Sequence, residues 1–223
     1  MLTTEKFAGD KKVGLSLLGK WEKKFVDAYV GKIPKSIETY HLTLSTIVWC
    51  AFIVLFGYLA KYDVRWFWGT SIMIVLQYLT DLFDGAVGRY RNTGLIHWGY
   101  YMDHFLDYIF LCAVLIGYSF TFLDRFNTIF FILASYGAFM VNSYLSFSAT
   151  NEFRIAYFKI GPTEIRLSFI ITNILIIFSK DKVPLTSLLP IIFWLSMAGL
   201  TVVVYTTQKM MWKKDMENKK SLT

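Results

Sequence analysis

The chain has 223 residues, of which 55% are hydrophobic, 18% aromatic and 17% charged. This composition is too apolar for one soluble core of that length and predicts an all-α, polytopic membrane protein. The net charge of +7 does not indicate a nucleic-acid partner, because the basic residues form no single patch with interleaved aromatics. The two cysteines lie in apolar runs, and no Cys/His spacing predicts a zinc site.

The first segment, residues 1–40, is polar and mixed and lacks a signal-peptide pattern. Apolar residues recur in it at helical spacing with lysines between them, as Leu18, Trp21, Phe25 and Tyr29 with Lys20, Lys23 and Lys24. This pattern predicts a basic amphipathic helix at the cytoplasmic membrane interface. The alternative is a surface helix that docks on the protein's own loops.

Six segments are long and apolar enough to cross a membrane as helices. They cover residues 41–60, 66–84, 102–123, 128–147, 166–178 and 184–205. The fifth is short unless it is extended into its flanks, from Pro162 to Ser179. We therefore expect a six-helix transmembrane catalytic domain at 41–206, followed by a basic tail at 207–223.

An even number of crossings places both termini on one side of the membrane. Of the 23 Lys and Arg residues, 18 fall on the side of the termini, where the positive-inside rule places the cytoplasm. This bias predicts cytoplasmic termini and accounts for the net charge. The basic tail is then suited to acidic lipid headgroups.

Four carboxylates lie within or beside apolar runs at the cytoplasmic side of the second and third segments. Helical spacing arranges them in two stripes: Asp81, Asp84, Gly85 and Gly88, then Gly99, Asp103 and Asp107. The short connection predicts that the two helices are antiparallel neighbours and that the four carboxylates converge. Converging carboxylates in a low-dielectric site need cations.

All-oxygen ligands suit hard divalent ions, so the stretch predicts a site for Mg²⁺ or Mn²⁺, with one or two ions. Gly85 and Gly88 leave room for a bulky group at the helix backbone. Arg89 and Arg91 lie at the predicted membrane surface, where they can meet phosphate oxygens. Together these features predict a metal-phosphate site that opens towards the cytoplasm.

This stretch resembles the signature of the CDP-alcohol phosphotransferase family, Asp-x2-Asp-Gly-x2-Ala-Arg, a spacer of eight to twelve, then Gly-x3-Asp-x3-Asp. Seven of the eight fixed positions match, and Gly88 stands where alanine is usual. Glycine keeps this position small but loosens the helix by about 1 kcal/mol relative to alanine.

The resemblance implies transfer of a phosphoalcohol from a CDP-linked donor to a hydroxyl acceptor, with release of CMP. It also implies that two metal ions are bound in the site. It implies metal binding by Asp81, Asp84, Asp103 and Asp107, with Asp107 as the general base. The nucleotide would be bordered by the two aspartates Asp81 and Asp84 and by Gly85, Gly88, Arg89 and Gly99. Similar proteins are often homodimers, which implies the same here.

The connection before the fifth segment is a candidate acceptor site, because glycine and proline break the helix beside three cations. Its candidate residues are Arg154, Lys159, Thr163, Glu164 and Arg166. A solvated loop that follows the positive-inside rule explains the same residues. His104 lies within the motif, but Asp107 already supplies a base.

The compact six-helix form resembles the branch of the family that uses CDP-diacylglycerol as the donor and a small water-soluble alcohol as the acceptor, in phospholipid synthesis. The alternative within the family, transfer from CDP-choline or CDP-ethanolamine to diacylglycerol, is favoured by the Thr163-Glu164 pair. An alternative of another class is a cation-coupled transporter, because intramembrane carboxylates also line ion paths. The identity of the alcohol does not follow from the sequence.

Overall fold

The computed structural model describes residues 11–13, 18–93, 95–122, 127–150, 152–154, 161–179 and 185–221. Its long elements are seven helices, α1 (Gly19–Tyr29), α2 (Thr39–Ala60), α3 (Phe67–Arg91), α4 (Ile96–Ser119), α5 (Thr128–Thr150), α6 (Pro162–Ser179) and α7 (Leu189–Ser221). Short 3-10 turns lie at Val30–Lys32, Val64–Trp66 and Leu185–Leu188. The strands β1 (Lys11–Val13) and β2 (Glu152–Arg154) pair in parallel. Apart from this pair the described elements are helical, which confirms the expected all-α class.

Five helices in the described part of the chain are long and apolar enough to span a membrane: α2, α4, α5, α6 and α7. This finding supports an integral membrane protein. The helix α3 has 25 residues, but polar side chains such as Gln77, Asp81 and Asp84 reduce its hydropathy. The sixth crossing therefore stays a prediction. The helix α6 has the extended bounds expected for the fifth segment, Pro162 to Ser179.

Local signals fix the start of α2 and the end of α3. The helix α2 begins with a capping box in which the backbone N–H of Glu38 donates to Nδ1 of His41 over 3.0 Å. The helix α3 ends at Asn92, whose φ of 57° is a left-handed conformation that asparagine tolerates. The chain therefore turns sharply between α3 and α4.

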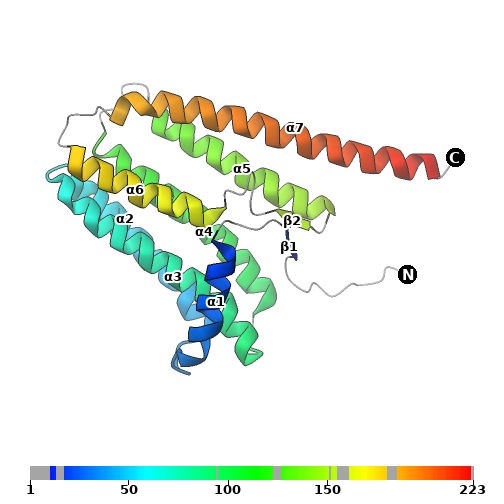
Figure 1. Cartoon of the computed structure of the whole chain (residues 1–223), viewed down its shortest axis with the longest axis horizontal. Coiled ribbons are helices and arrows are strands. Elements are labelled where there is room, and N and C mark those ends of the chain that lie inside the picture. The colour runs from blue at the N-terminus through cyan, green and yellow to red at the C-terminus, as the bar shows by residue number, and fades with distance from the viewer. Residues whose placement is uncertain are drawn as a thin grey trace.

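The helix α2 lies between the two acidic helices, because it packs against both α3 and α4. Among the described residues, the backbones of α3 and α4 make few close contacts, but their side chains meet as the predicted antiparallel neighbours do: the rings of Phe67 on α3 and Tyr118 on α4 are 5.6 Å apart, and Asp81 and Asp107 contact the same nitrogen of Arg166. A short connection limits the distance between two helix ends but does not require the helices to touch along their length. The helix α6 packs against α3, and α7 runs alongside α5 and extends past it (Figure 1).

A chain of buried polar groups joins three helices in the core. The hydroxyl of Tyr118 on α4 donates to Oδ1 of Asn173 on α6 over 2.8 Å, and Nδ2 of Asn173 donates to Oγ of Ser71 on α3 over 3.0 Å. Asn173 is fully buried. Because polar groups away from water need partners, these bonds fix the register of α3, α4 and α6.

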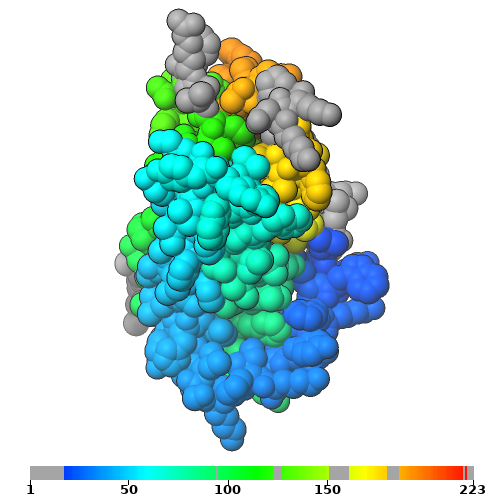
Figure 2. Space-filling view, turned by 90° about the vertical axis from the view of Figure 1, so that its left-hand side faces the viewer, coloured from blue at the N-terminus to red at the C-terminus, as the bar shows by residue number. Residues whose placement is uncertain are grey.

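The first helix packs against α3, beside which it lies in Figure 2. Its protein-facing side carries Glu22 and Val26, which are half-buried, whereas Trp21, Phe25 and Tyr29 are exposed. Trp21 therefore points away from the protein, whereas the partly exposed ring of Phe25 also contacts Phe83 of α3. Its placement at the membrane interface stays a prediction.

The closest approach between α2 and α4 is at two glycines. A Cβ added to Gly57 would lie 2.8 Å from the carbonyl carbon of Gly117, where backbone cannot move aside. We expect Gly57→Ala to lower the free energy of unfolding by about 1–3 kcal/mol, as overpacking does. Thermal unfolding in detergent measures this, with Gly19→Ala as control because no atom lies within 4 Å of its added Cβ. Equal stability of both variants would contradict this packing.

Candidate active site

The first half of the acidic stretch lies on one continuous helix. The helix α3 continues to Arg91, past the predicted end at residue 84, so Asp81, Asp84, Gly85 and Gly88 all lie on its last turns. Asp84 is 8% exposed and Gly88 is buried, whereas the side chain of Asp81 is 21% exposed. This stripe therefore faces the protein and not the lipid.

The second half lies on the first turns of α4. This helix begins at Ile96, before the predicted start at residue 102, so Gly99, Asp103 and Asp107 are all helical. The side chains of Asp103 and Asp107 are 26% and 23% exposed. Both carboxylates are thus partly screened from solvent but remain accessible.

One cation joins the two stripes. Nη2 of Arg166, on the second turn of α6, lies 3.1 Å from Oδ2 of Asp81 and 2.9 Å from Oδ1 of Asp107. Arg166 is only 5% exposed. Since two carboxylates from different helices contact the same nitrogen, the predicted convergence of Asp81 and Asp107 is present in the structure. The acidic helices α3 and α4 therefore meet at α6, through Arg166.

Further contacts orient the guanidinium of Arg166. Its Nε donates to Oε1 of Gln77 over 2.8 Å, and Gln77 is 1% exposed. The guanidinium carbon lies 5.9 Å from the ring centroid of Tyr78 and 5.5 Å from that of Phe110. A planar guanidinium held by an amide, two carboxylates and two rings has little freedom to rotate.

The residues on α4 can hold a metal ion. Among the described residues, ligand atoms of Asp103, His104 and Asp107 lie within 4.8 Å of one another. Nδ1 of His104 is 3.7 Å from Oδ2 of Asp103. Carboxylate oxygens with one imidazole fit Mg²⁺ or Mn²⁺ better than a soft metal. The donor set therefore fits the metal that the acidic stretch predicts.

Asp84 lies against α2. Its Oδ2 accepts a hydrogen bond of 2.9 Å from Oγ1 of Thr43, and its Oδ1 accepts the backbone N–H of Gly85. Thr43 is 3% exposed. A buried hydroxyl therefore fixes the direction of the Asp84 carboxylate.

Two of the predicted nucleotide-binding positions, Gly85 and Gly99, have space beside them. A Cβ added at Gly99 would meet no atom within 4 Å, and one added at Gly85 would meet only the end of the Arg89 side chain, at 3.1 Å. Arg89 is exposed. The space beside these two glycines is thus available to a ligand, with the exposed cation of Arg89 next to Gly85.

The predicted acceptor residues separate into three groups. Lys159 lies outside the described residues, and Arg154 ends the strand β2. Thr163 and Glu164 make contacts within the protein: Thr163 donates to Glu22 over 2.5 Å, and Glu164 accepts the backbone N–H of Gly161 over 2.8 Å. Arg166 contacts the acidic residues Asp81 of α3 and Asp107 of α4.

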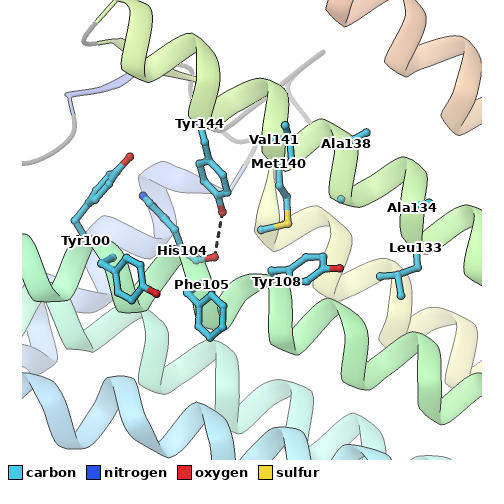
Figure 3. Close-up of a pocket in the computed structure, with 12 residues that line it drawn as sticks. Tyr100, His104, Phe105, Tyr108, Leu133, Ala134, Ala138, Met140, Val141 and Tyr144 are labelled. Atoms are coloured by element: carbon cyan, nitrogen blue, oxygen red, sulfur yellow. Dashed lines mark hydrogen bonds between the residues drawn. The ribbon is translucent and has the colours of Figure 1, made fainter.

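A groove of about 700 Å³ opens between α4 and α5, beside the carboxylates (Figure 3). Aromatic side chains of α4 form one wall, and small residues of α5 form the other. They include Tyr100, His104, Phe105 and Tyr108 on α4, and Ala134, Gly137, Ala138 and Val141 on α5. The hydroxyl of Tyr144 donates to the carbonyl of His104 over 3.0 Å and closes one end. The walls are suited to an apolar group.

Sequence reasoning missed three residues that orient the site, namely Gln77, Thr43 and Glu22. Gln77 could have been found, because an amide within an apolar helical run needs a buried partner. Thr43 and Glu22 carry no such signal, since threonine is common in apolar helices and Glu22 lies among the charges of a polar segment.

Comparison with protein families matches the chain, over residues 39–206, to the model of CDP-alcohol phosphatidyltransferase. Neither the curated proteins nor the solved structures contain a significant match. The matched region runs from the start of α2 to the middle of α7 and includes both acidic stripes and Arg166. Members of this family are transferases that act on CDP-linked alcohols and use divalent metal ions. The chain belongs to the CDP-alcohol phosphatidyltransferase family.

Proposed function

We propose that the protein transfers a phosphatidyl group from CDP-diacylglycerol to a small alcohol and releases CMP, as a step of phospholipid synthesis. The observation that carries this proposal is the meeting of Asp81 and Asp107 at Arg166, where the acidic stripes of α3 and α4 converge. The apolar groove between α4 and α5, next to these residues, supports a lipid as one substrate. The transporter alternative is set aside because the family is one of transferases.

The residues of the two stripes bind metal or nucleotide in this proposal, and Asp81 and Asp84 take part in both. Asp81, Asp84, Asp103 and Asp107 hold one or two Mg²⁺ or Mn²⁺ ions, and Asp81, Asp84, Gly85, Gly88, Arg89 and Gly99 border the cytidine diphosphate. Bound metal supplies charge neutralisation to the diphosphate and to the leaving CMP. Arg166 borders the acceptor beside Asp107, with the loop residues Arg154, Lys159, Thr163 and Glu164 as the outer part of the acceptor site.

Asp107 acts as the general base. It accepts the proton of the acceptor hydroxyl while the acceptor oxygen forms a bond to the phosphorus of the phosphatidyl group. The bond between that phosphorus and the bridging oxygen of the diphosphate breaks, and the electron pair leaves with CMP. Arg166, 2.9 Å from Asp107, holds the carboxylate in a fixed direction for this transfer.

The layout in the membrane is part of the same proposal. Residues 41–206 form a catalytic domain of six crossings that includes α3. Residues 1–40 lie at the cytoplasmic interface and 207–223 form a basic tail, so the active site and both termini face the cytoplasm. We also propose a homodimer, which the mass of the protein in lipid nanodiscs tests directly.

An assay of CMP release tests the function. Purified protein in nanodiscs is given Mg²⁺ and either CDP-diacylglycerol with glycerol phosphate, inositol phosphate or serine, or CDP-choline or CDP-ethanolamine with diacylglycerol. We expect release with CDP-diacylglycerol and one of the alcohols. Release only with a CDP-aminoalcohol would support the alternative within the family, and no release with any pair would refute both.

The contact between Thr43 and Asp84 gives a test of the metal site. We expect Thr43→Val to weaken Mn²⁺ binding by about 10- to 100-fold, because partners that orient a metal ligand have effects of this size. Electron paramagnetic resonance of free Mn²⁺ measures the affinity, with Thr206→Val on the exposed side of α7 as the matched control. Unchanged affinity in Thr43→Val would argue against Asp84 as a ligand.

A further inference from the structure

Glu22 of α1 contacts the active site from outside the matched region, which begins at residue 39. Its Oε1 accepts a hydrogen bond of 2.8 Å from the hydroxyl of Tyr78 on α3 and one of 2.5 Å from Oγ1 of Thr163 on α6. One carboxylate oxygen therefore joins three helices. Hydrogen bonds to an ionised acceptor are stronger than neutral ones, so this is a specific connection and not a loose surface contact.

Both donors also flank Arg166. The ring centroid of Tyr78 lies 5.9 Å from its guanidinium carbon, and Thr163 precedes Arg166 by three residues, on the first turn of α6. Thr163 is 8% exposed and Arg166 is 5% exposed. A shift of Tyr78 or of the first turn of α6 would therefore move the guanidinium relative to Asp81 and Asp107.

The rest of α1 holds Glu22 in place. Val26, one turn further on, packs against the cluster of Val30, Ala86 and Val87 at the end of α3, and the rings of Phe25 and Phe83 are 5.8 Å apart. The neighbouring charged residues Lys23, Lys24 and Asp27 are exposed. Glu22 is thus the charged residue of α1 that turns towards the protein and makes hydrogen bonds with it.

We propose that Glu22 is a positioning residue for the transfer reaction. By accepting both hydroxyls it fixes the ring of Tyr78 and the first turn of α6, and these two fix the direction of Arg166 at Asp107. Helix α1 then belongs to the catalytic unit. The inference rests on the proposed function, in which Arg166 borders the acceptor.

The test compares four variants in the CMP-release assay, with the KM of donor and acceptor measured separately. We expect Glu22→Met to lower kcat/KM for the acceptor by about 100-fold, the usual effect of a misplacement near 1 Å. The KM of the donor should stay unchanged. Glu22→Gln should stay close to wild type, because its amide oxygen accepts the same two bonds. The matched controls, Asp27→Met and Asp27→Gln, should have no effect.

Coupling gives a second measurement. Thr163→Val should lower kcat/KM for the acceptor on its own. It should add no further loss in the Glu22→Met background, because both changes remove the same hydrogen bond between Thr163 and Glu22. Equal loss in Glu22→Met and Asp27→Met would overturn the inference, as would a parallel rise in the KM of both substrates. If Glu22→Met does not fold, Thr163→Val and Tyr78→Phe replace it, and an unchanged acceptor KM in both overturns the inference.

Hydrogen exchange separates this inference from the proposed function. Glu22→Met should speed amide exchange in the first turn of α6, and Asp27→Met should not. If wild-type protein releases no CMP with any donor, the proposed function fails, yet the exchange experiment still decides whether Glu22 fixes α6. Unchanged exchange in Glu22→Met then overturns the inference on its own.

Discussion

Asp107→Asn is expected to lower kcat for CMP release by about 10²- to 10⁴-fold, the usual contribution of a general base. Asparagine has nearly the same shape, but its amide cannot accept the proton of the acceptor hydroxyl. It also removes one negative charge from the group formed by Asp103, His104 and Asp107. The measurement is single-turnover CMP release at saturating Mg²⁺, so that weaker metal binding does not limit the rate.

The control for this variant is Asp63→Asn, which makes the same chemical change in the connection between α2 and α3. Hydrogen bonds from Arg65 lower the pKa of Asp63, so its carboxylate is ionised like that of a metal ligand, but it lies outside the acidic stripes. Its removal should leave the rate unchanged. Full activity in Asp107→Asn would show that another group removes the proton, and His104 would be the next candidate.

The second large effect is expected for Arg166→Met. Removing the cation leaves Asp81 and Asp107 facing each other across a site where Arg166 was almost fully buried. Loss of one partner of a buried ion pair lowers the free energy of unfolding by about 3–5 kcal/mol. We expect this loss in metal-free protein, together with loss of transfer activity.

Magnesium should restore much of the lost stability, because a bound cation can neutralise the same carboxylates and stabilises the folded state by mass action. The thermal midpoint of Arg166→Met should therefore rise more steeply with Mg²⁺ concentration than that of wild type. Arg65→Met, which removes an exposed pair, should change stability little and show no added dependence on Mg²⁺. A midpoint of Arg166→Met that follows the wild-type curve would contradict the pairing.

The sequence was sufficient to identify the helices and the acidic stripes, because both depend on local periodicity. Spacing of three and four places Asp81 with Asp84, and Asp103 with Asp107, on one face each, whatever the helices pack against. The family assignment likewise follows from fixed spacing within one stretch. These predictions needed no knowledge of how distant segments meet.

What could not be predicted depends on contacts between distant segments. The packing of α2 against both α3 and α4 depends on contacts that the short connection between α3 and α4 does not encode. Arg166 was expected at the acceptor loop, but its pairing with Asp81 and Asp107 depends on how α6 is placed against α3 and α4. In the sequence, Glu22 is one of several charges in a polar segment. Its hydrogen bonds to Tyr78 and Thr163 depend on how α1 is placed against α3 and α6.

The contact of Gly57 with Gly117 has a mechanical consequence. No side chain lies between the two backbones there, so no change of rotamer can alter the spacing of α2 and α4 at this point. Asp107 is ten residues earlier on α4, which is about 15 Å along the helix at 1.5 Å per residue. The distance between α2 and α4 at the end that carries the carboxylates can therefore increase only if α4 tilts about the contact at Gly117. A small tilt at this point shifts the general base Asp107.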